Sequence, residues 1–307
     1  MRQNGFPVLF CWPQLAVIIL VFYDTKFSSS AQVDNVPSLL LISFDGFRWD
    51  YLKRTETPNF DKFIESGVYA INGLQSVFPT VTLTNHWSLV TGLYAESHGI
   101  IDNDMYDPII NKTYIPLFKI EKIKKIKNFH NDDRFYDFNG VEPIWVSNRL
   151  QYPKRRSGSI MWWGAENEIK GVRPLYHMPY REEDVDYADN IDKMIDLFSS
   201  PTDPINLGLL YFGESDELAH KYGPDSYNVT EMISKADLLL EYLLEEFDRV
   251  GLLDRMNIII TADHGFAPVS RKRLIHLDNI VDKSLYRAVH YSPVATIIPN
   301  QGKSFYV

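Results

Sequence analysis

Carboxylate and imidazole side chains stand at or just beyond the ends of three short apolar runs in this 307-residue sequence. They are Asp45, the pair Asp216 and His220, and the adjacent Asp263 and His264. Carboxylate oxygens and imidazole nitrogens are common zinc ligands. The single cysteine, Cys11, lies in an N-terminal apolar stretch, which excludes a cysteine nucleophile, a thiolate zinc site and an internal disulfide. The chemistry indicated is therefore metal-assisted.

The spacing within this set agrees with a metal site. In open α/β sheets, binding sites form beyond the carboxyl ends of the strands, so residues distant in sequence can meet there. Asp216 and His220 are four residues apart, which puts both on one face of a helical turn. Asp263 and His264 could serve one metal from two sides or two different metals. Any one of these residues alone more often caps a helix or is a hydrogen-bonded core side chain, but three strand ends together favour a metal pair about 3.5–4 Å apart.

A nucleophile is available next to a predicted helix. The segment FPTVTLTN leads directly into residues 85–93, whose apolar spacing is helical. A hydroxyl at a helix N-terminus lies in a positive partial field, which favours an alkoxide and an incoming phosphate. Thr80, Thr82 and Thr84 are all candidates. Each of them could instead cap the helix, and spacing alone does not choose among them.

Apolar runs that alternate with helical patterns position these side chains. Buried strands are predicted at residues 39–44, 74–78, 159–163, 207–212, 257–261 and 294–298. Helices are predicted at residues 85–93, 141–150, 185–198 and 230–250, of which the last has the strongest apolar stripe. This alternation indicates an α/β fold with a mostly parallel sheet that helices cover on both faces.

The composition is that of a globular protein, with 45% hydrophobic and 23% charged residues. It excludes a disordered chain and a membrane protein with several spans. The net charge of −9 argues against binding to a nucleic-acid polymer, although a local basic pocket could still hold an anion.

The N-terminus indicates the secretory pathway. A basic residue precedes a mostly apolar stretch that is followed by SSSAQ, and this layout predicts a signal peptide over residues 1–31. An uncleaved signal anchor and a buried core helix are the alternatives. Sequons at Asn111 and Asn228 predict glycosylation and agree with an extracellular or cell-surface location. We therefore expect residues 32–307 to form the folded domain.

Five blocks of the sequence together resemble a known enzyme family. They are SFDGFR at residues 43–48, FPTVTLTNHWS at 78–88, GLYAESHGIIDN at 92–103, DELAHKYGP at 216–224 and TADHG at 261–265. In this order they are similar to the ectonucleotide pyrophosphatase/phosphodiesterase family, above all to its short members of the member 4 and member 5 type. The resemblance runs from about residue 39 to residue 299. It implies the alkaline-phosphatase-like α/β/α fold, two zinc ions and a threonine nucleophile.

The resemblance also implies a role for individual residues. The ligands of one zinc would be Asp45, Asp263 and His264, and those of the other would include Asp216 and His220. Thr82 would be the nucleophile at the first metal, and Asn103 would bind the phosphoryl oxygens. Tyr180 stands where the family stacks a nucleotide base, Trp162 lies near a related turn, and Leu83 replaces the phenylalanine that usually follows the nucleophile. These last three are the predicted substrate contacts.

The sequence departs from the family pattern near its end. The family's second zinc has a further histidine ligand well beyond the last motif, whereas this sequence stops at Val307, and His276 and His290 come too early. We therefore expect a catalytic domain that is truncated at its C-terminus and whose second zinc site is incomplete. Membrane association would come from a C-terminal anchor outside this sequence or from an uncleaved N-terminus.

Three functions are compatible with these observations. The first is an extracellular zinc phosphodiesterase that hydrolyses nucleotide phosphodiester or pyrophosphate bonds, in which Thr82 attacks phosphorus and water releases the phospho-threonine. The second is a phosphomonoesterase or choline phosphodiesterase of the same fold. The third is an inactive, truncated ectodomain. A small nucleotide or another phosphodiester is the expected substrate of the first.

Overall fold

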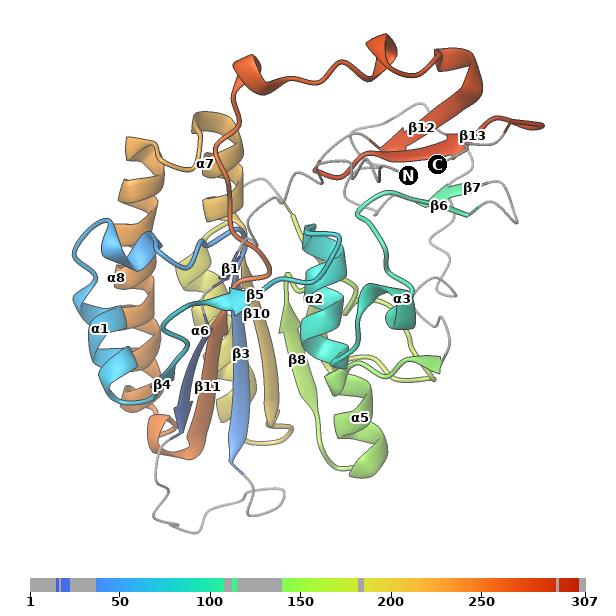
Figure 1. Cartoon of the computed structure of the whole chain (residues 1–307). Coiled ribbons are helices and arrows are strands. Elements are labelled where there is room, and N and C mark those ends of the chain that lie inside the picture. Colours follow the sequence, from blue (N-terminus) through green and yellow to red (C-terminus); the bar gives the residue numbers. More distant parts are fainter. Residues whose placement is uncertain are drawn as a thin grey trace, which may run out of the picture.

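The structure is a computed structural model that describes residues 15–16, 18–22, 37–107, 112–114, 140–181, 185–290 and 293–303. Within these residues, one central sheet carries helices on both of its faces, so the architecture has three layers (Figure 1). The α/β fold predicted from the alternation of apolar runs is confirmed.

The central sheet has seven strands, five of which are parallel. In spatial order the strands are β4 (Val68–Tyr69), β2 (Ile18–Phe22), β11 (Met256–Thr261), β3 (Ser38–Phe44), β10 (Leu207–Phe212), β8 (Ser157–Ile160) and β9 (Tyr176–Met178). The strands from β11 to β9 run parallel, whereas β2 is antiparallel to both of its neighbours. The parallel strands are short apolar runs because both faces of the sheet are covered.

The register of the central strands separates the two faces. Tyr211 of β10 pairs with Ser43 of β3, which pairs with Thr261 of β11, so these three side chains share one face. The next residues, Phe44 and Phe212, point to the other face and stack with ring centroids 4.7 Å apart. Ser43 and Tyr211 contact His86 of α2 (Thr82–Thr91), whereas Phe44 and Phe212 pack against α1 and α6 on the other face.

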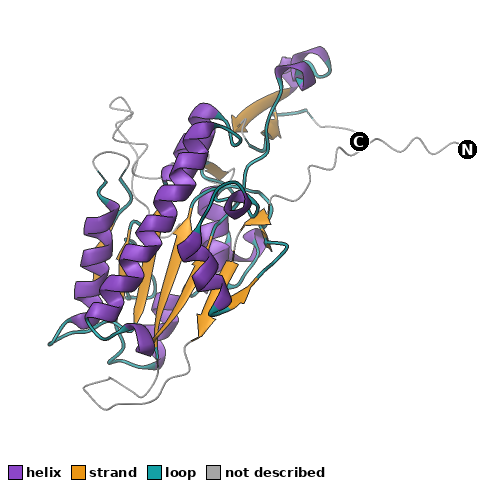
Figure 2. Cartoon of the chain, turned by 90° about the vertical axis from the view of Figure 1, so that its left-hand side faces the viewer, coloured by secondary structure: helices purple, strands orange, loops and turns teal. Residues whose placement is uncertain are grey.

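The helices form two layers. Phe44 and Phe212 contact Phe60 of α1 and Tyr187 of α6, which places these helices on one face together with α8. Their bounds are α1 (Pro58–Glu65), α6 (Tyr187–Ser199) and α8 (Tyr227–Arg249). The bounds of the remaining helices are α2 (Thr82–Thr91), α3 (Ala95–His98), α5 (Ile144–Gln151) and α7 (Glu214–Tyr222). Figure 2 shows α8 lying along the sheet, and its predicted apolar stripe is buried there.

Capping hydrogen bonds explain where helices α8 and α1 begin. The Ser226 side chain accepts a hydrogen bond from the third residue of α8. Helix α1 is capped from outside, because the buried carboxylate of Asp237 accepts from the backbone N–H groups of Asn59 and Phe60, at 3.0 and 2.8 Å. Asp237 lies on α8, so this contact also fixes α1 against α8.

Three further sheets have two strands each. Their antiparallel pairs are β1 (Leu15–Ala16) with β5 (Leu74–Gln75), β6 (Met105–Asp107) with β7 (Lys112–Tyr114), and β12 (Tyr286–His290) with β13 (Thr296–Pro299). Single 3-10 turns occur at Tyr51–Lys53, Leu253–Arg255, Arg271–Arg273, Leu277–Asn279 and Lys283–Leu285. The strand predicted at residues 294–298 is thus part of a hairpin that Figure 1 shows apart from the central sheet. The residues of β13 are half-buried or exposed, and β12 is the strand that they pair with among the described residues.

The N-terminal apolar stretch contributes strand β2. Residues 18–22, which the sequence assigns to a signal peptide, pair with β11 from Thr261 to Asn257. Most of the predicted leader lies outside the described residues, so its cleavage stays a prediction. No helix within the described residues has both the length and the apolar character that a bilayer span requires.

Candidate metal centre and active site

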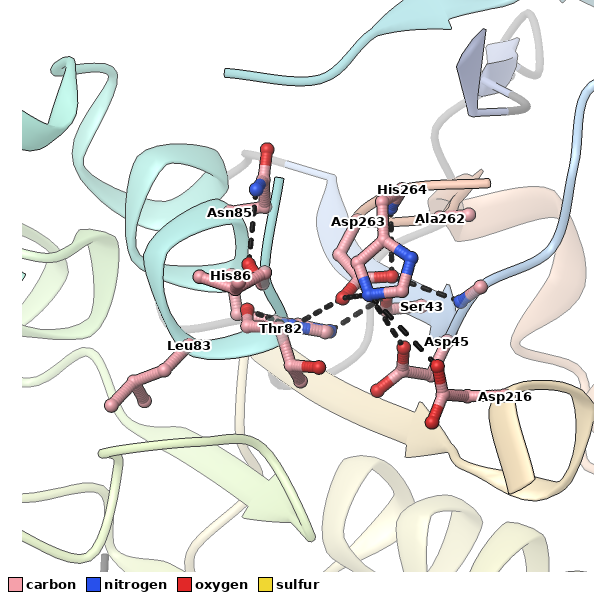
Figure 3. A network of polar contacts seen from close by, with 12 residues as sticks. Ser43, Asp45, Thr82, Leu83, Asn85, His86, Asp216, Ala262, Asp263 and His264 are labelled. Atoms are coloured by element: carbon pink, nitrogen blue, oxygen red, sulfur yellow. Dashed lines mark hydrogen bonds and ion pairs between the residues drawn. The ribbon is translucent and has the colours of Figure 1, made fainter. Parts of the chain in front are cut away.

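The polar clusters predicted from the sequence lie together at one edge of the sheet. Asp45 follows β3, and Asp263 and His264 follow β11. Asp216 lies in the first turn of α7, just beyond β10. Since β11, β3 and β10 are parallel neighbours, their carboxyl ends bring these side chains together, as Figure 3 shows.

Ligand atoms from four residues converge at this edge. The Nε2 atom of His264 lies 3.4 Å from Oδ1 of Asp45 and 3.2 Å from Oδ2 of Asp263. It lies 4.0 Å from Oδ1 of Asp216. These three carboxylate oxygens are buried, and none has a hydrogen-bond partner among the described residues. Buried polar atoms normally form hydrogen bonds. Three buried carboxylate oxygens without such bonds, close together, therefore indicate a binding site for a positively charged group.

The contacts of the His264 ring decide which nitrogen would carry the hydrogen when the ring is neutral. Nδ1 lies 3.1 Å from the carbonyl oxygen of Gly265, which can only accept, so Nδ1 donates and Nε2 keeps its lone pair. The ligand atoms of Asp45, Asp263 and His264 all lie within 4.8 Å of one another. A divalent cation could bind between this lone pair and the carboxylate oxygens that have no hydrogen bond. Zinc accepts nitrogen and oxygen ligands without sulfur.

The raised pKa values of the three carboxyl groups also favour a bound cation. Burial, and then the charge of Asp263, raise the pKa of Asp45 well above its ordinary value. Burial, and then the charge of Asp45, do the same to the pKa of Asp216. Burial also raises the pKa of Asp263 to about 8, although the N–H of Gly46 opposes this effect. Three carboxylates in one buried place repel each other, and a bound cation removes that repulsion.

Asp216 and His220 form a second group that is more open to solvent. The turn of α7 places His220 Nε2 3.5 Å from Asp216 Oδ1, as their four-residue spacing predicts. The side chain of His220 is 68% exposed and that of Asp216 is 20% exposed. Asp216 therefore lies between His264 and His220 and links the buried group to the open one. The roles of all five residues as metal ligands stay predictions.

The structure distinguishes the candidate nucleophiles. Helix α2 begins at Thr82, three residues earlier than the sequence indicates, after the extended residue Val81. Thr82 is half-buried at the N-terminus of the helix, whereas Thr84 is 0% exposed. Thr80 precedes the helix. Thr82 is therefore the accessible hydroxyl at the positive end of α2.

Asn103 lies beside this helix end. Its Oδ1 atom accepts a hydrogen bond from the N–H of Leu83 at 2.8 Å, so its NH₂ group is not used in that contact. This position agrees with the role in phosphoryl binding that the sequence predicts. The side chain of Leu83 is only 2% exposed, which leaves it little surface for the predicted substrate contact.

An aromatic cluster adjoins the metal centre. Tyr180, just after β9, stacks on Trp163 with ring centroids 4.5 Å apart, and its hydroxyl lies 3.3 Å from a carboxylate oxygen of Glu217. Trp162 is 1% exposed and meets the ring of His86 edge-on. Both tryptophans are therefore buried, and Tyr180, which is half-buried, is the most accessible ring of the three. The substrate-binding roles of Tyr180 and Trp162 stay predictions.

Sequence reasoning missed three residues that contact the site. The hydroxyl of Tyr211 donates to Oδ2 of Asp45 at 2.5 Å. The N–H of Gly46 donates to Oδ1 of Asp263 at 3.0 Å. His86 contacts both Thr82 and Asp263, and burial lowers its pKa to about 3, so its ring is neutral. The four-residue spacing of Thr82 and His86 was the available signal for the last of these.

The structure describes only one of the two predicted glycosylation sites, Asn228. Asn228 is half-buried near the N-terminus of α8. Asn111 lies outside the described residues. Glycosylation at either position stays a prediction.

The three-layer fold, with an acidic centre at the carboxyl edge of a parallel sheet, defines the alkaline-phosphatase-like class. Within that class, a sequence model of the type I phosphodiesterase / nucleotide pyrophosphatase family matches residues 39–307. The chain belongs to this family, which confirms the resemblance carried by the five sequence blocks.

Named relatives agree with this assignment. Ectonucleotide pyrophosphatase/phosphodiesterase family member 5 of Homo sapiens is 41% identical over 289 residues, which are 94% of this chain and 57% of the relative. A bis(5'-adenosyl)-triphosphatase of Mus musculus is 38% identical over 286 residues, which are 92% of this chain and 59% of the relative. The chain thus spans a little more than half the length of these relatives.

A solved structure supports the fold independently. Murine ectonucleotide pyrophosphatase/phosphodiesterase 5, as an inactive threonine-to-alanine variant in complex with AMP, matches with a TM-score of 0.77 and 41% identity. The match covers 87% of this chain and 67% of the murine one.

Proposed function

We propose that this chain is the catalytic part of an extracellular, zinc-dependent hydrolase that cleaves nucleotide phosphodiester or pyrophosphate bonds through a phospho-threonine at Thr82. One observation carries the proposal: three buried, unpaired carboxylate oxygens converge on the lone pair of His264. Thr82 belongs to the same network, because its carbonyl oxygen and Asp263 are both within reach of one nitrogen of His86.

The donor set would hold the metal in two groups. Asp45, Asp263 and His264 would hold one zinc, and Asp216 and His220 would contribute to a second. Bound zinc ions would stabilise the attacking and leaving oxygens and lower the pKa of the Thr82 hydroxyl.

The chain's own residues would perform the transfer. The Oγ atom of Thr82 forms a bond to phosphorus while the bond from phosphorus to the leaving oxygen breaks. The N-terminus of α2 and the NH₂ group of Asn103 would stabilise the charge on the phosphoryl oxygens. Water then attacks the same phosphorus, which breaks its bond to Oγ and restores the hydroxyl.

The names of the relatives support a nucleotide substrate. The murine member 5 structure contains AMP, and the murine relative at 38% identity is named as a bis(5'-adenosyl)-triphosphatase. Tyr180 is half-buried next to the metal centre and rests on the buried ring of Trp163, so it supplies an aromatic side chain of the kind that a base can stack on. The inactivity of the murine threonine variant supports a threonine nucleophile.

The test compares Thr82→Ala with its neighbour Thr80→Ala. Hydrolysis of nitrophenyl thymidine monophosphate is measured together with the zinc content of each purified protein. We expect Thr82→Ala to lose more than about a thousandfold in turnover with unchanged zinc, and Thr80→Ala to stay within about tenfold of wild type. Turnover like that of wild type in Thr82→Ala would refute the nucleophile.

Two further substrates test the alternatives. A preference for nitrophenyl phosphate would favour a phosphomonoesterase, and a preference for nitrophenyl phosphocholine would favour a choline phosphodiesterase. Less than one bound zinc and no hydrolysis of any of the three would favour an inactive ectodomain. A mass decrease on enzymatic deglycosylation of secreted protein tests the extracellular location.

A further inference from the structure

His86 is a wholly buried histidine that the proposed reaction does not use. It lies on α2, one helical turn after Thr82, and is 0% exposed. The rings of Trp162 and Tyr211 meet it edge-on, with centroids 5.1 and 5.2 Å away. Packing on two sides fixes the plane of the imidazole ring, so its two nitrogens have definite neighbours.

The neighbours of each nitrogen fix the position of the ring hydrogen. Nδ1 lies 2.8 Å from the carbonyl oxygen of Thr82 and 3.4 Å from Oδ2 of Asp263. A carbonyl oxygen can only accept, so Nδ1 carries the hydrogen. Nε2 of the neutral ring then accepts from the hydroxyl of Ser43, which is 2.9 Å away. Ser43 is held in this position by its register between β10 and β11.

The two oxygens of Asp263 have different partners as a result. Oδ1 accepts from the N–H groups of Gly46 and His264, at 3.0 and 2.8 Å. Oδ2 lies 3.2 Å from Nε2 of His264 and 3.4 Å from Nδ1 of His86. Nδ1 of His86 therefore donates to Thr82, the residue that bears the hydroxyl, and lies next to the Asp263 oxygen that is left for a metal.

We propose that His86 is a positioning residue: its Nδ1–H binds the carbonyl of Thr82, and the same side of the ring lies against Oδ2 of Asp263, so the ring sets the separation of the two. The inference rests on the proposed function, and it adds a residue that contacts neither the substrate nor the metal. Groups that orient a metal ligand in this way typically change metal affinity or activity by about 10- to 100-fold when they are removed.

Three substitutions of His86 distinguish a positioning role of its Nδ1–H from a role of the ring in packing alone. In His86→Asn the side-chain NH₂ lies near the place of Nδ1, in His86→Gln it lies near the place of Nε2, and His86→Phe keeps only the ring. Zinc affinity is measured by competition with a chelator, and kcat and KM on nitrophenyl thymidine monophosphate. We expect zinc affinity and kcat to fall about 10- to 100-fold in the Phe and Gln variants, with KM little changed, and to stay within about fivefold of wild type in His86→Asn.

His98 provides the matched control. It is also buried, at 1% exposure, and its ring bonds to Ser88 and to the N–H of Ile100, with no contact to the metal centre. His98→Phe should lower the free energy of unfolding and leave the zinc affinity of the folded protein unchanged. Ser43→Ala, which removes only the hydroxyl at Nε2, should weaken zinc binding by less than about tenfold.

The results that would refute the role of His86 differ from those that would refute the proposed function. Equal zinc affinities in His86→Asn and His86→Phe would overturn the positioning role, because then the Nδ1 donor has no effect. If wild type binds zinc but hydrolyses no diester, the proposed function fails and the contrast between Asn and Phe in zinc affinity still decides the role of His86. If wild type binds no zinc, both proposals fail.

Discussion

The two halves of the candidate metal centre are built on different supports. The buried half follows strands β3 and β11, and the side chains of Asp45, Asp263 and His264 are 2%, 0% and 9% exposed. The open half lies on one turn of α7, where Asp216 and His220 are 20% and 68% exposed. Strand ends in a packed sheet are held by many distant contacts, whereas a helical turn fixes two side chains through its own backbone.

This difference shows in how each ligand is held. In the buried half, Asp45 accepts from Tyr211, Asp263 accepts from the N–H of Gly46, and His264 donates to the carbonyl of Gly265. In the open half, His220 makes an edge contact to the ring of Phe266. The buried half is therefore preorganised, and its carboxylates repel one another without a cation. We expect metal binding to affect stability most strongly there, and to affect activity more than stability at the open half, where Asp216 alone shares the repulsion.

The largest contrast should come from removing one histidine in each half. His264→Ala takes a ligand from the buried half and should lower both zinc affinity and turnover by more than about 100-fold, since even indirect contacts to a metal ligand have effects of that size. His220→Ala should lose turnover while one tightly bound zinc remains. Metal analysis and diester assays measure both. Equal loss of all metal in the two variants would show that the halves are not separate.

The pH dependence of the metal-free protein should expose the repulsion in the buried half. The pKa of Asp263 is about 8 in the folded protein against 3.8 ordinarily, so the folded state binds more protons between these values. The free energy of unfolding should therefore fall as pH rises from about 4 to about 8, by up to about 1.4 kcal/mol per pH unit for each proton. Denaturant titrations at several pH values test this.

Two controls accompany that measurement. Saturating zinc should abolish the decrease in the free energy of unfolding with rising pH, because the cation replaces the proton on the carboxylate. Asp263→Asn should reduce the fall in the metal-free protein, since one titrating carboxyl group is gone while Asp45 and Asp216, whose pKa values are also raised, remain. A metal-free wild type that is as stable at pH 8 as at pH 4 would contradict the repulsion.

Gly46 joins the two halves, and a substitution there should disturb the open one. Its φ is +65°, and an added Cβ would lie 2.6 Å from the ring of Phe266 and 3.3 Å from the backbone of Asp216. Gly46→Ala should therefore cost about 2–4 kcal/mol of stability from backbone strain and overpacking together, and should weaken zinc binding at α7.

Gly92 is a matched control for the strain alone. Its φ is +69°, and an added Cβ would meet no atom within 4 Å. Gly92→Ala should cost only about 1–2 kcal/mol and leave zinc content unchanged. Phe266→Ala in the Gly46→Ala background should restore part of the loss. Identical effects of the two glycine substitutions on zinc would argue against a packing link through Phe266.

The smallest effect should come from Tyr211→Phe, which removes one hydroxyl behind the buried half. The bond from Tyr211 to Oδ2 of Asp45 orients that carboxylate, so its loss should weaken the buried zinc by about tenfold and leave the α7 half unaffected. Stepwise chelator titration resolves the two sites. A change confined to the weaker site would reverse the assignment of Tyr211 to the buried half.

Much of this site could be predicted from local sequence patterns. Apolar runs marked the strands β3, β10 and β11 to within one residue, because buried parallel strands need continuous apolar segments. The general position of binding sites in α/β sheets then placed Asp45, Asp216 and Asp263 at one edge. The four-residue spacing of Asp216 and His220 was sufficient for their contact, since a helical turn fixes it locally.

Only the tertiary structure decided the contacts between distant segments. The resemblance to the family had already implied Thr82, but that Thr82 stays accessible while Thr84 is buried depends on the surrounding core. The bond of His86 to Ser43 spans 43 positions and that of Tyr211 to Asp45 spans 166, and both depend on strand register. The separate hairpin of β12 and β13 likewise follows from pairing and not from apolar pattern. Periodicity reports the environment of each residue along its own element, whereas register and packing between elements determine which side chains meet.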